Sequence, residues 1–581
     1  MEQSDVCTPA NGGDTPRERA AGFSAKREDC DSGAPKERMM AGADESFDYI
    51  IVGGGTAGCV LASRLSADPR VRVLLLEAGP ESNSMWVGMP IAFSKLFMSK
   101  TLNWGYSTEP EAKLNDRPIY WPRGKLLGGC SAINGLSYIR GHFEDFNLWR
   151  QLGNAGWGWS DVLPYFLKSE RRDGPLGEYH GRQGPMAVSD LRYVHPTARD
   201  FIAAGANLGI RRTDDLNGAV LEGIGHPHYT IDRGVRHSTA DAFLKPARNR
   251  ANLTVETEAL TRSVLVEGGR VVGVKYERGG AIRLALAGRE VLLSAGAIGS
   301  PQILMLSGIG PADHLKQHGI AVTADLPGVG ENLQDHPYAH CTCRTRPADS
   351  LNPQFQGLRL LWHGINYYLA KRGPLTIGAA QAMAFVRGLP GAHRPDLQIN
   401  FRPLSHRYDE RSRISPDPVP RITAAVCYLQ PKSRGRLLLK SAEPKAAPAI
   451  YANYLDDVQD EQAMVAGVKW VRRLFATEPL KSRVLSEDAP GEDCRSDDDI
   501  RGFLRATGQT MCHPVGTCKM GHDSLAVVDD RLRVRGIGGL RVADASVMPI
   551  ITSGNTAAAT IMIAEKAADF AIEAQRAFAA A

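Results

Sequence analysis

The chain has 581 residues, of which 43% are hydrophobic and 23% charged, and its formal net charge at neutral pH is +5. This composition excludes a wholly disordered or fibrous protein, and the length predicts more than one domain. The basic residues are scattered along the chain, so we expect no nucleic-acid partner. Ten cysteines are too few for a disulfide scaffold of this length, which favours reduced thiols and a cytoplasmic protein.

The first 46 residues contain many charges of both signs and few apolar side chains, so we expect residues 1–46 to form a disordered tail. They lack the hydrophobic stretch of a secretory signal. The chain has no run of 18 or more uncharged apolar residues. We therefore expect no transmembrane segment, and peripheral contact with a membrane stays open.

Order is expected to begin with a βαβ unit. Residues 47–52 form an apolar run of strand length, and residues 53–58 are rich in glycine. A helical pattern follows at 59–65, and residues 72–77 predict a second buried strand. Two apolar strands joined through a helix imply a parallel sheet that is covered on both faces.

The glycine-rich turn has the spacing of a dinucleotide-binding fingerprint, G-x-G-x-x-G, and an acidic residue ends the second strand. Glycines let the backbone approach a pyrophosphate, which the helix N-terminus attracts, while the acidic side chain can accept hydrogen bonds from the ribose. This pattern predicts dinucleotide binding without separating FAD from NAD. The candidate contacts are Gly53, Gly55, Thr56, Ala57, Gly58 and Glu77.

The middle of the chain is less regular. Residues 251–295 alternate in short β-rich runs with a glycine turn at 268–269, which predicts a hairpin followed by another core strand. Residues 149–159 are rich in tryptophan and glycine and predict a loop or lid. Residues 332–505 are richer in aromatics and proline and predict a separate domain that faces the substrate.

Three further motifs narrow the choice of cofactor. They are the glycine-rich segment 123–135 (RGKLLGGCSAING), the segment 296–310 (GAIGSPQILMLSGIG), and the segment 512–521 (CHPVGTCKMG) with its continuations at 541–546 and 553–556. With the fingerprint, and in this order, they resemble the glucose-methanol-choline (GMC) oxidoreductases, which are FAD-dependent alcohol oxidases and dehydrogenases. The resemblance covers residues 47–575.

This resemblance implies an α/β fold. A Rossmann-like FAD-binding domain is expected from residues 47–150, 230–330 and 506–575. A second, substrate-binding domain, built on an antiparallel sheet and carrying the lid, is expected from residues 151–229 and 331–505.

The resemblance also implies further contacts to FAD. It places one loop along the flavin, another beside the ribityl chain, and the N-terminus of a long alanine-rich helix at the flavin N1/C2=O region. A helix N-terminus there would stabilise the negative charge of the reduced flavin. The residues implied are, in that order, Gly128, Gly129, Ser131 and Asn134; Asp544 and Ala545; and Asn555 and Thr556.

His513 matches the active-site histidine of the family. Hydride transfer from an alcohol requires the hydroxyl proton to leave, and an imidazole with a pKa near neutrality suits that task. Asn555 matches the second catalytic position, which is Asn or His in the family. An amide can hold the substrate oxygen but cannot accept its proton, so the base role falls on His513.

Two departures from relatives refine the prediction. In choline oxidases with covalent FAD, the linking histidine precedes the asparagine of the glycine-rich motif, and here that position is Ile133, so we expect non-covalent FAD. In choline-specific members a glutamate holds the trimethylammonium group, and Gln381 stands at the comparable position. A cationic substrate would lose its counter-charge there.

The function expected is FAD-dependent oxidation of an uncharged primary alcohol, aromatic or medium-chain aliphatic, to the aldehyde by hydride transfer to flavin N5. O₂ or another acceptor would take the electrons, and we expect no metal. The aromatic stretch 362–368 could contact such a substrate or be ordinary core. The alternatives are a hydroxynitrile lyase, a fatty-acid photodecarboxylase in which Arg402 pairs the carboxylate, or a non-catalytic dinucleotide-binding protein.

Overall fold

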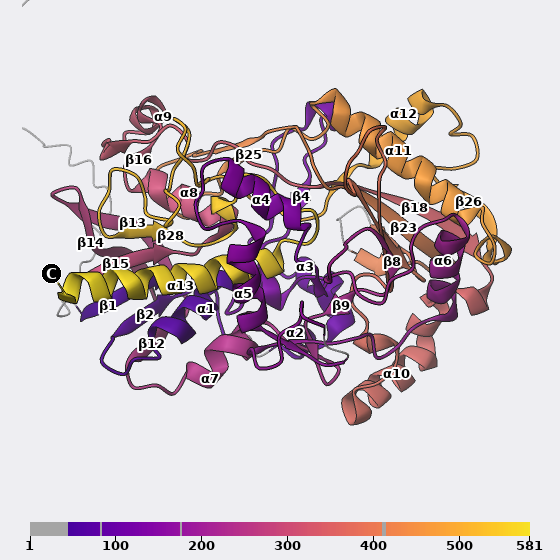
Figure 1. Cartoon of the computed structure of the whole chain (residues 1–581), viewed down its shortest axis with the longest axis horizontal. Helices are drawn as coiled ribbons and strands as arrows, with labels where there is room; N and C mark the ends of the chain where they lie inside the picture. The colour runs from indigo at the N-terminus through magenta and orange to yellow at the C-terminus, as the bar shows by residue number, and fades with distance from the viewer. Residues whose placement is uncertain (1–44, 82–83, 175–176, 409–413, 581) are drawn as a thin grey trace, which may run out of the picture. The chain divides into compact units, whose positions relative to one another are not determined.

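A computed structural model describes residues 45–81, 84–174, 177–408 and 414–580 (Figure 1). The predicted tail therefore lies outside the described residues, except for its last two. Glu45 and Ser46 belong to the first strand, β1 (Glu45–Val52), so order begins two residues earlier than expected.

A parallel sheet forms the first half of the fold and confirms the predicted βαβ unit. Tyr49–Val52 of β1 pairs in parallel with β2 on one side and β15 on the other. Its central residues, Ile50 and Ile51, are fully buried, as expected when helices cover both faces. The other parallel strands are β2 (Val73–Leu76), β12 (Leu253–Glu256), β15 (Ala281–Leu293) and β28 (Leu540–Val542). Helix α1 (Thr56–Leu65) joins β1 to β2.

The predicted hairpin extends this sheet. Strands β13 (Ala259–Glu267) and β14 (Arg270–Arg278) pair antiparallel with each other, and β14 pairs antiparallel with β15. Gly268 and Gly269 both have positive φ, which glycine adopts without strain, so the turn lies where the sequence placed it.

A second, antiparallel sheet lies beside the first, and the two together confirm the predicted α/β fold. Its strands run in the order β26, β18, β23, β20, β19, β8, with β27 paired to β18. Except for β27, they fall in the segments predicted for the substrate domain; β27 falls in the segment predicted for the FAD domain. Their bounds are β8 (Gly223–Gly225), β18 (Pro337–Thr345), β19 (Ala382–Val386), β20 (Leu397–Arg402), β23 (Arg421–Tyr428), β26 (Val484–Ala489) and β27 (Gln509–Thr510).

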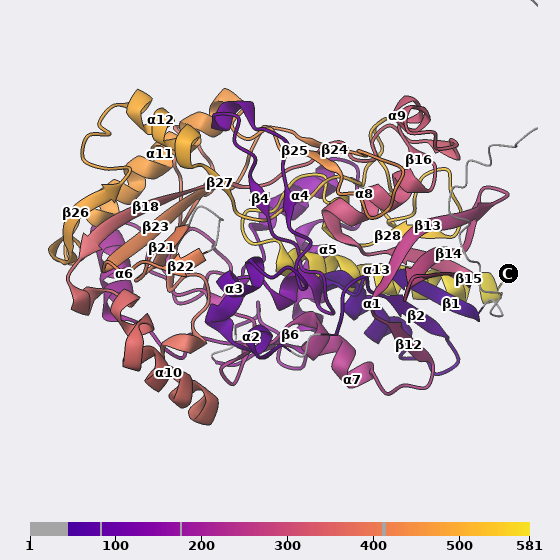
Figure 2. The ribbon, with the colours of Figure 1, turned by 180° about the vertical axis from the view of Figure 1, so that it is seen from behind.

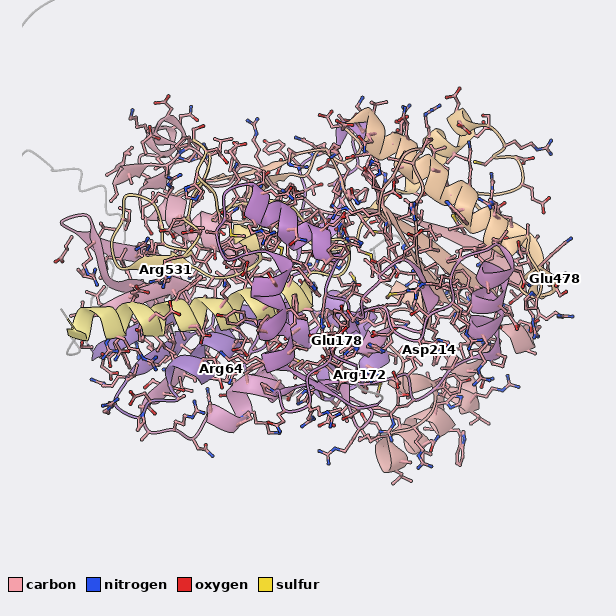
Figure 3. The ribbon with its side chains drawn as sticks, in the orientation of Figure 1. Arg64, Arg172, Glu178, Asp214, Glu478 and Arg531 are labelled. Carbon is pink, nitrogen blue, oxygen red and sulfur yellow. The ribbon has the colours of Figure 1, made fainter. Side chains whose placement is uncertain are left out.

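The C-terminal helix α13 (Ala557–Ala580) runs along α1 and α5 (Trp159–Ser169), as both views show (Figures 1 and 2). Arg64 on α1 donates two hydrogen bonds to the buried carboxylate of Glu565, at 2.7 and 2.6 Å. Arg531 pairs with Glu573 further along the helix (Figure 3). The last helix is thereby fixed to the first, and its N-terminus is held in place.

The tryptophan-rich segment 149–159 is not a lid. Trp149 and Trp157 are completely buried, and Trp157 packs edge-on against Phe570 of α13. The Trp157 indole N–H donates to the carbonyl of Asp530 at 2.8 Å. The segment is a tightly packed connection, because Trp149 and Trp157 face the core instead of the solvent.

The remaining elements surround the two sheets, and no helix in the described ranges is long and apolar enough to cross a membrane. The other helices are α2 (Met85–Gly88), α3 (Phe93–Phe97), α4 (Phe143–Gln151), α6 (Pro196–Asn207), α7 (Lys245–Ala247), α8 (Gly296–Leu306), α9 (Ala312–Gln317), α10 (Gly357–Ala370), α11 (Val458–Phe475) and α12 (Asp497–Thr507). Short strands pair outside the main sheets: β3 (Tyr106–Ser107), β4 (Tyr120–Trp121), β5 (Ser137–Tyr138), β6 (Glu170–Arg172), β7 (Met186–Val188), β9 (His228–Tyr229), β10 (Ile231–Asp232), β11 (Val235–Arg236), β16 (Ile309–Gly310), β17 (Ala324–Asp325), β21 (His406–Tyr408), β22 (Ile414–Pro416), β24 (Arg436–Leu438) and β25 (Ala449–Tyr451).

Candidate active site

A cavity of about 1010 Å³ extends from the parallel sheet to the antiparallel one. Val52, Glu77 and Ser294, at the carboxyl ends of β1, β2 and β15, line one part of it, and His340 and Asn400 of the second sheet line another. The carboxyl ends of parallel strands are where open α/β sheets bind ligands. The volume reaches the upper end of the roughly 300–1,000 Å³ typical of small-molecule sites, which leaves room for a large cofactor.

Most of the predicted cofactor contacts line this cavity. They are Gly53, Gly55, Thr56, Ala57, Glu77, Gly129, Asn134, Asp544, Ala545, Asn555 and Thr556. Three others, Gly58, Gly128 and Ser131, are not part of its lining, and their contact with FAD stays a prediction.

These three residues shape the wall from behind. A Cβ on Gly58 would lie 1.8 Å from the Gly53 carbonyl oxygen, so only glycine lets the helix start this close to the turn. The Gly128 N–H donates to the Gly54 carbonyl at 2.8 Å, and the Ser131 hydroxyl donates to the Gly128 carbonyl at 2.6 Å. The glycine-rich loop is thus hydrogen-bonded to the fingerprint turn.

Glu77 is held by the same turn. Its two carboxylate oxygens accept hydrogen bonds from the N–H groups of Gly54 and Gly79, both at 2.8 Å. Burial raises the pKa of Glu77 to about 7, against the lowering effect of these bonds. Two hydroxyls that line the cavity nearby, those of Thr261 and Ser294, are buried without a hydrogen-bond partner among the described residues. The donor set therefore fits a polar, hydroxyl-bearing cofactor.

The predicted catalytic pair, from segments 42 residues apart, meets in the cavity wall. Asn555 Nδ2 lies 3.1 Å from His513 Nε2, and both residues line the cavity. Asn555 precedes α13, and His513 follows β27. The Asp335 carboxylate accepts a hydrogen bond from the His513 backbone N–H at 2.6 Å, which fixes the chain at the histidine.

A second histidine, which the sequence analysis did not single out, sets the tautomer of the first. His336 Nδ1 lies 3.0 Å from His513 Nδ1, and His336 Nε2 lies 3.2 Å from the Leu429 carbonyl oxygen. Burial lowers the pKa of His336 to about 3, so its ring is neutral and has a single proton. A carbonyl only accepts, which assigns that proton to Nε2 of His336 and leaves Nδ1 as the acceptor. His513 therefore donates from Nδ1 and presents the lone pair of Nε2 beside Asn555.

The protonation state of His513 follows from its surroundings. Burial, the neighbouring His336 and the cationic Arg123 all hold its pKa well below the ordinary histidine range. We expected a pKa near neutrality, whereas the structure lowers the pKa, chiefly because the ring is buried. The imidazole is consequently neutral, and able to accept a proton, across the physiological range.

Asn555 is oriented from its other side by Gln398, another residue not identified from the sequence. Gln398 Nε2 donates to Asn555 Oδ1 at 3.4 Å and to Asn400 Oδ1 at 2.8 Å. The Asn555 amide N–H is therefore the group turned to His513. The alternation of Gln398, Asn400 and Arg402 along β20 was a period-two polar signal that could have indicated a wall of a polar site.

Two expectations about the substrate region are wrong. Gln381 does not line the cavity: its side chain accepts from the His195 N–H at 2.8 Å and donates to the Tyr193 carbonyl at 3.3 Å. The aromatic stretch 362–368 does not line the cavity: it belongs to α10, where Trp362 and Tyr368 are exposed and only Tyr367 is buried as core. Arg402, in contrast, does line the cavity, with Nη2 2.6 Å from His340 Nδ1.

Comparison with known proteins assigns the chain to a family. The family model described as GMC oxidoreductase matches residues 47–338 with its N-terminal part and residues 431–564 with its C-terminal part. The chain belongs to the GMC oxidoreductase family. This assignment confirms the resemblance drawn from the motifs, and it makes the protein an oxidoreductase that uses FAD.

Named GMC relatives are similar over nearly their whole length. An alcohol dehydrogenase [acceptor] from Pseudomonas putida is 44% identical over 531 residues, covering 90% of this chain and 96% of the relative. An oxygen-dependent choline dehydrogenase from Rhizobium etli is 42% identical over 528 residues, covering 90% and 95%.

Solved GMC structures share the fold. Pyridoxine 4-oxidase from Mesorbium loti superposes with a TM-score of 0.82 at 32% identity, covering 90% of this chain and 98% of that one. Formate oxidase from Aspergillus oryzae gives 0.86 at 28% identity, covering 92% and 99%.

The residue at the linking position argues for non-covalent FAD in this GMC protein. Ile133 lines the cavity, and an alkyl side chain cannot form a bond to the flavin. We expect acid or heat precipitation to release the flavin into the supernatant, as its absorbance would show. Flavin that stays with the precipitated protein after washing in denaturant would contradict this prediction.

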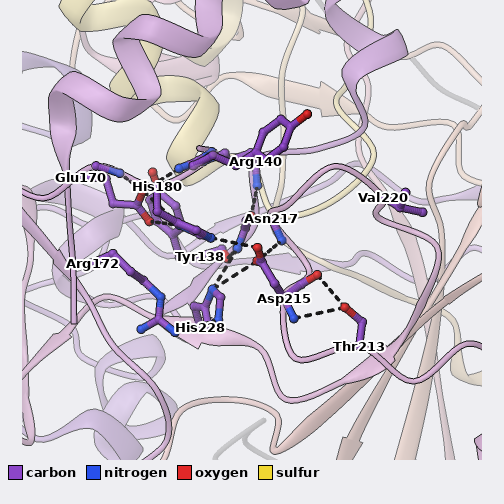
Figure 4. A network of polar contacts seen from close by, with 12 residues as sticks. Tyr138, Arg140, Glu170, Arg172, His180, Thr213, Asp215, Asn217, Val220 and His228 are labelled. Atoms are coloured by element: carbon purple, nitrogen blue, oxygen red, sulfur yellow. Dashed lines mark hydrogen bonds and ion pairs between the residues drawn. The ribbon is translucent and has the colours of Figure 1, made fainter. Parts of the chain in front are cut away.

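A second cluster of titratable groups lies around His180, away from the cavity lining (Figure 4). His180 Nε2 lies 2.9 Å from Asp215 Oδ2, and His180 Nδ1 lies 3.2 Å from Glu170 Oε1, whose other oxygen accepts from Arg140 at 2.5 Å. Burial lowers the pKa of His180, but the hydrogen bonds to Asp215 and Glu170 outweigh it and raise the pKa to about 9. His180, Asp215 and His228 are close enough to ligate one metal ion. With both ring nitrogens protonated, His180 pairs with Asp215 and Glu170 and makes the cluster a charged bridge between chain segments.

Proposed function

We propose that this GMC oxidoreductase oxidises an uncharged primary alcohol, aromatic or medium-chain aliphatic, to the corresponding aldehyde. The observation that carries this proposal is the neutral His513 with its Nε2 lone pair beside the Asn555 amide in the cavity wall. Bound FAD would take the hydride at N5. Relatives named for alcohol and choline dehydrogenation support the reaction class.

Each residue of the pair has a role that its chemistry permits. His513 Nε2 accepts the hydroxyl proton, which a neutral imidazole can do without first losing one. Asn555 holds the substrate oxygen at that nitrogen, and Gln398 keeps the amide from turning. The N-terminus of α13, with Thr556 in the cavity wall, favours negative charge on a ligand placed before it. O₂ or another acceptor would then reoxidise the cofactor.

The charges of the cavity support an uncharged substrate over a cationic one. Among the described lining residues the only carboxylates are Glu77 and Asp544, and both are hydrogen-bonded to backbone N–H groups of the glycine-rich turns. The substrate region instead contains the guanidinium of Arg402. We therefore expect poor choline turnover because Arg402 repels a cationic substrate. The glutamine at position 381 is not the reason, since Gln381 does not line the cavity.

This proposal predicts that choline has a kcat/KM at least about tenfold below that of benzyl alcohol or 1-octanol, a difference of about 1.4 kcal/mol in transition-state binding. The measurement is anaerobic flavin bleaching, which also separates alcohol oxidation from lyase or photodecarboxylase chemistry. Arg402→Met should narrow the gap for choline while the octanol rate changes little. Absence of bleaching by every alcohol, or a preference for choline or for an ω-hydroxy carboxylate, would contradict the proposal.

We also propose a cytoplasmic location. The cysteines within the described ranges are free thiols, which is the usual state in a reducing compartment.

A further inference from the structure

Helix α10 has an apolar face that the rest of the described chain leaves uncovered. Leu358 and Leu369 are each 83% exposed, and Trp362 is 64% exposed. Scattered apolar side chains on a surface are ordinary, whereas a contiguous patch of them marks an interaction site. The exposed apolar residues of this helix are Leu358, Leu360, Leu361, Trp362, Ile365, Tyr368 and Leu369.

The spacing of these residues places most of them on one face. Positions 358, 361, 362, 365, 368 and 369 repeat at intervals of three and four, the period of an amphipathic stripe. Fourteen residues make a helix about 21 Å long. In both views α10 lies at the edge of the described chain (Figures 1 and 2).

The helix is nevertheless firmly attached. Tyr367 is the one buried residue of α10, and its hydroxyl donates to the Gly88 carbonyl at 3.0 Å. Lys371, the residue after the helix, places its ammonium group 4.6 Å from the centre of the Tyr367 ring. An apolar face held in a fixed position on the surface is suited to contact another surface.

The charges of this region select the partner. No acidic residue occurs between Asp349 and Asp396, whereas Arg359, Lys371 and Arg372 lie on or directly after α10. Basic residues beside an apolar face that contains tryptophan and tyrosine are the pattern of helices that lie in the interface of an anionic membrane. A symmetric contact between two copies would bring the same cations together, which disfavours a dimer through this face.

We propose that α10 is a peripheral membrane-binding helix. Its apolar stripe enters the boundary between headgroups and acyl chains of an anionic lipid bilayer, and its basic residues contact the lipid headgroups. The protein is thereby held on the membrane surface without spanning it.

The position of α10 also connects the membrane to the cavity. Gly88, to which Tyr367 is bonded, ends α2, and the chain continues through residues 90–92 into α3. Phe93 and Phe97 of α3 line the cavity. An apolar alcohol dissolved in the bilayer would thus meet an apolar cavity wall close to the anchored helix. This last step rests on the proposed function, whereas membrane binding itself does not.

The test is flotation of the full-length holoprotein with vesicles of phosphatidylcholine alone or mixed with phosphatidylglycerol at 3:1. Wild type should float with the anionic vesicles. The double variant Leu361→Gln, Trp362→Gln should bind at least tenfold more weakly, and Arg359→Gln, Arg372→Gln should lose the preference for anionic lipid. Leu485→Gln is the matched control, because Leu485 is 63% exposed on β26, outside α10.

FAD content and thermal unfolding should be the same in all variants, since the side chains replaced are exposed. A wild type that does not float with either vesicle overturns the proposal. Equal flotation of wild type and the Leu361/Trp362 variant also overturns it. A concentration-dependent dimer that this variant abolishes, with no vesicle binding by the wild type, overturns it as well. Loss of alcohol oxidation with flotation intact would contradict only the proposed function.

Discussion

His513→Ala should slow anaerobic flavin reduction by an alcohol by about 10²- to 10⁴-fold, the range that general-base assistance supplies, while FAD stays bound. The reason is geometric: Nε2 of His513 is the basic nitrogen held beside Asn555 in the cavity wall. Stopped-flow absorbance of the flavin measures the step directly. Asn555→Ala should also slow reduction, because the substrate oxygen is no longer held.

The pH dependence separates the two residues. A base must be unprotonated, so kcat/KM falls as the pH falls through its pKa. Because burial, His336 and Arg123 lower the pKa of His513, we expect kcat/KM to be flat through neutrality and to fall only well below pH 6.5. Asn555→Ala should keep this acidic limb, and His513→Ala should lose it. A His513→Ala enzyme with the wild-type rate, or with an unchanged profile, would assign the proton to another group.

His336→Leu should reduce the rate of flavin reduction by about 10- to 100-fold, the size usual for residues that orient a functional histidine. With the acceptor at His336 Nδ1 gone, the proton of neutral His513 is free to occupy Nε2, the nitrogen that must accept the substrate proton. The fall of kcat/KM at acidic pH should also move to higher pH, because one of the groups that lower the His513 pKa is removed.

His336→Asn is the matched control. Its amide oxygen takes the place of Nδ1 and can accept from His513 Nδ1, so the hydrogen bond that sets the His513 tautomer is preserved. We expect this variant to recover most of the lost rate. FAD content, measured beside each rate, distinguishes positioning from misfolding. Equal rates for the Leu and Asn variants would show that His336 acts only through packing.

The parts of the molecule that could be predicted from sequence are those specified by neighbouring residues. The apolar runs of β1 and β2, the glycine turn between them and the β13–β14 hairpin depend on local patterns of period and turn chemistry. The strands of the second sheet gave weaker signals. Ala382–Val386, for example, is buried at every position and has no alternation.

The errors concern which way a side chain faces. Gln381 directly precedes β19, and its side chain points to Tyr193 and His195 instead of lining the cavity. A motif register gives the place of a residue along the chain and not the direction of its side chain. The aromatic residues 362–368 have a helical period, and a period does not reveal whether anything covers the face. His336 was missed because its partner is 177 residues away.

The late position of β28 and α13 in the chain has a consequence for the synthesis of the protein. β28 pairs with β15, α13 packs on α1, and Asn555 lines the cavity, yet all three are translated long after β1 and α1. At about 5–20 residues per second, the ribosome finishes β1 and α1 roughly 25 to 100 s before their last partners exist. Until then a nascent chain presents an incomplete cavity wall, and we expect it to hold FAD less tightly than the finished fold. We therefore expect purified chains that stop before β28 to retain little FAD.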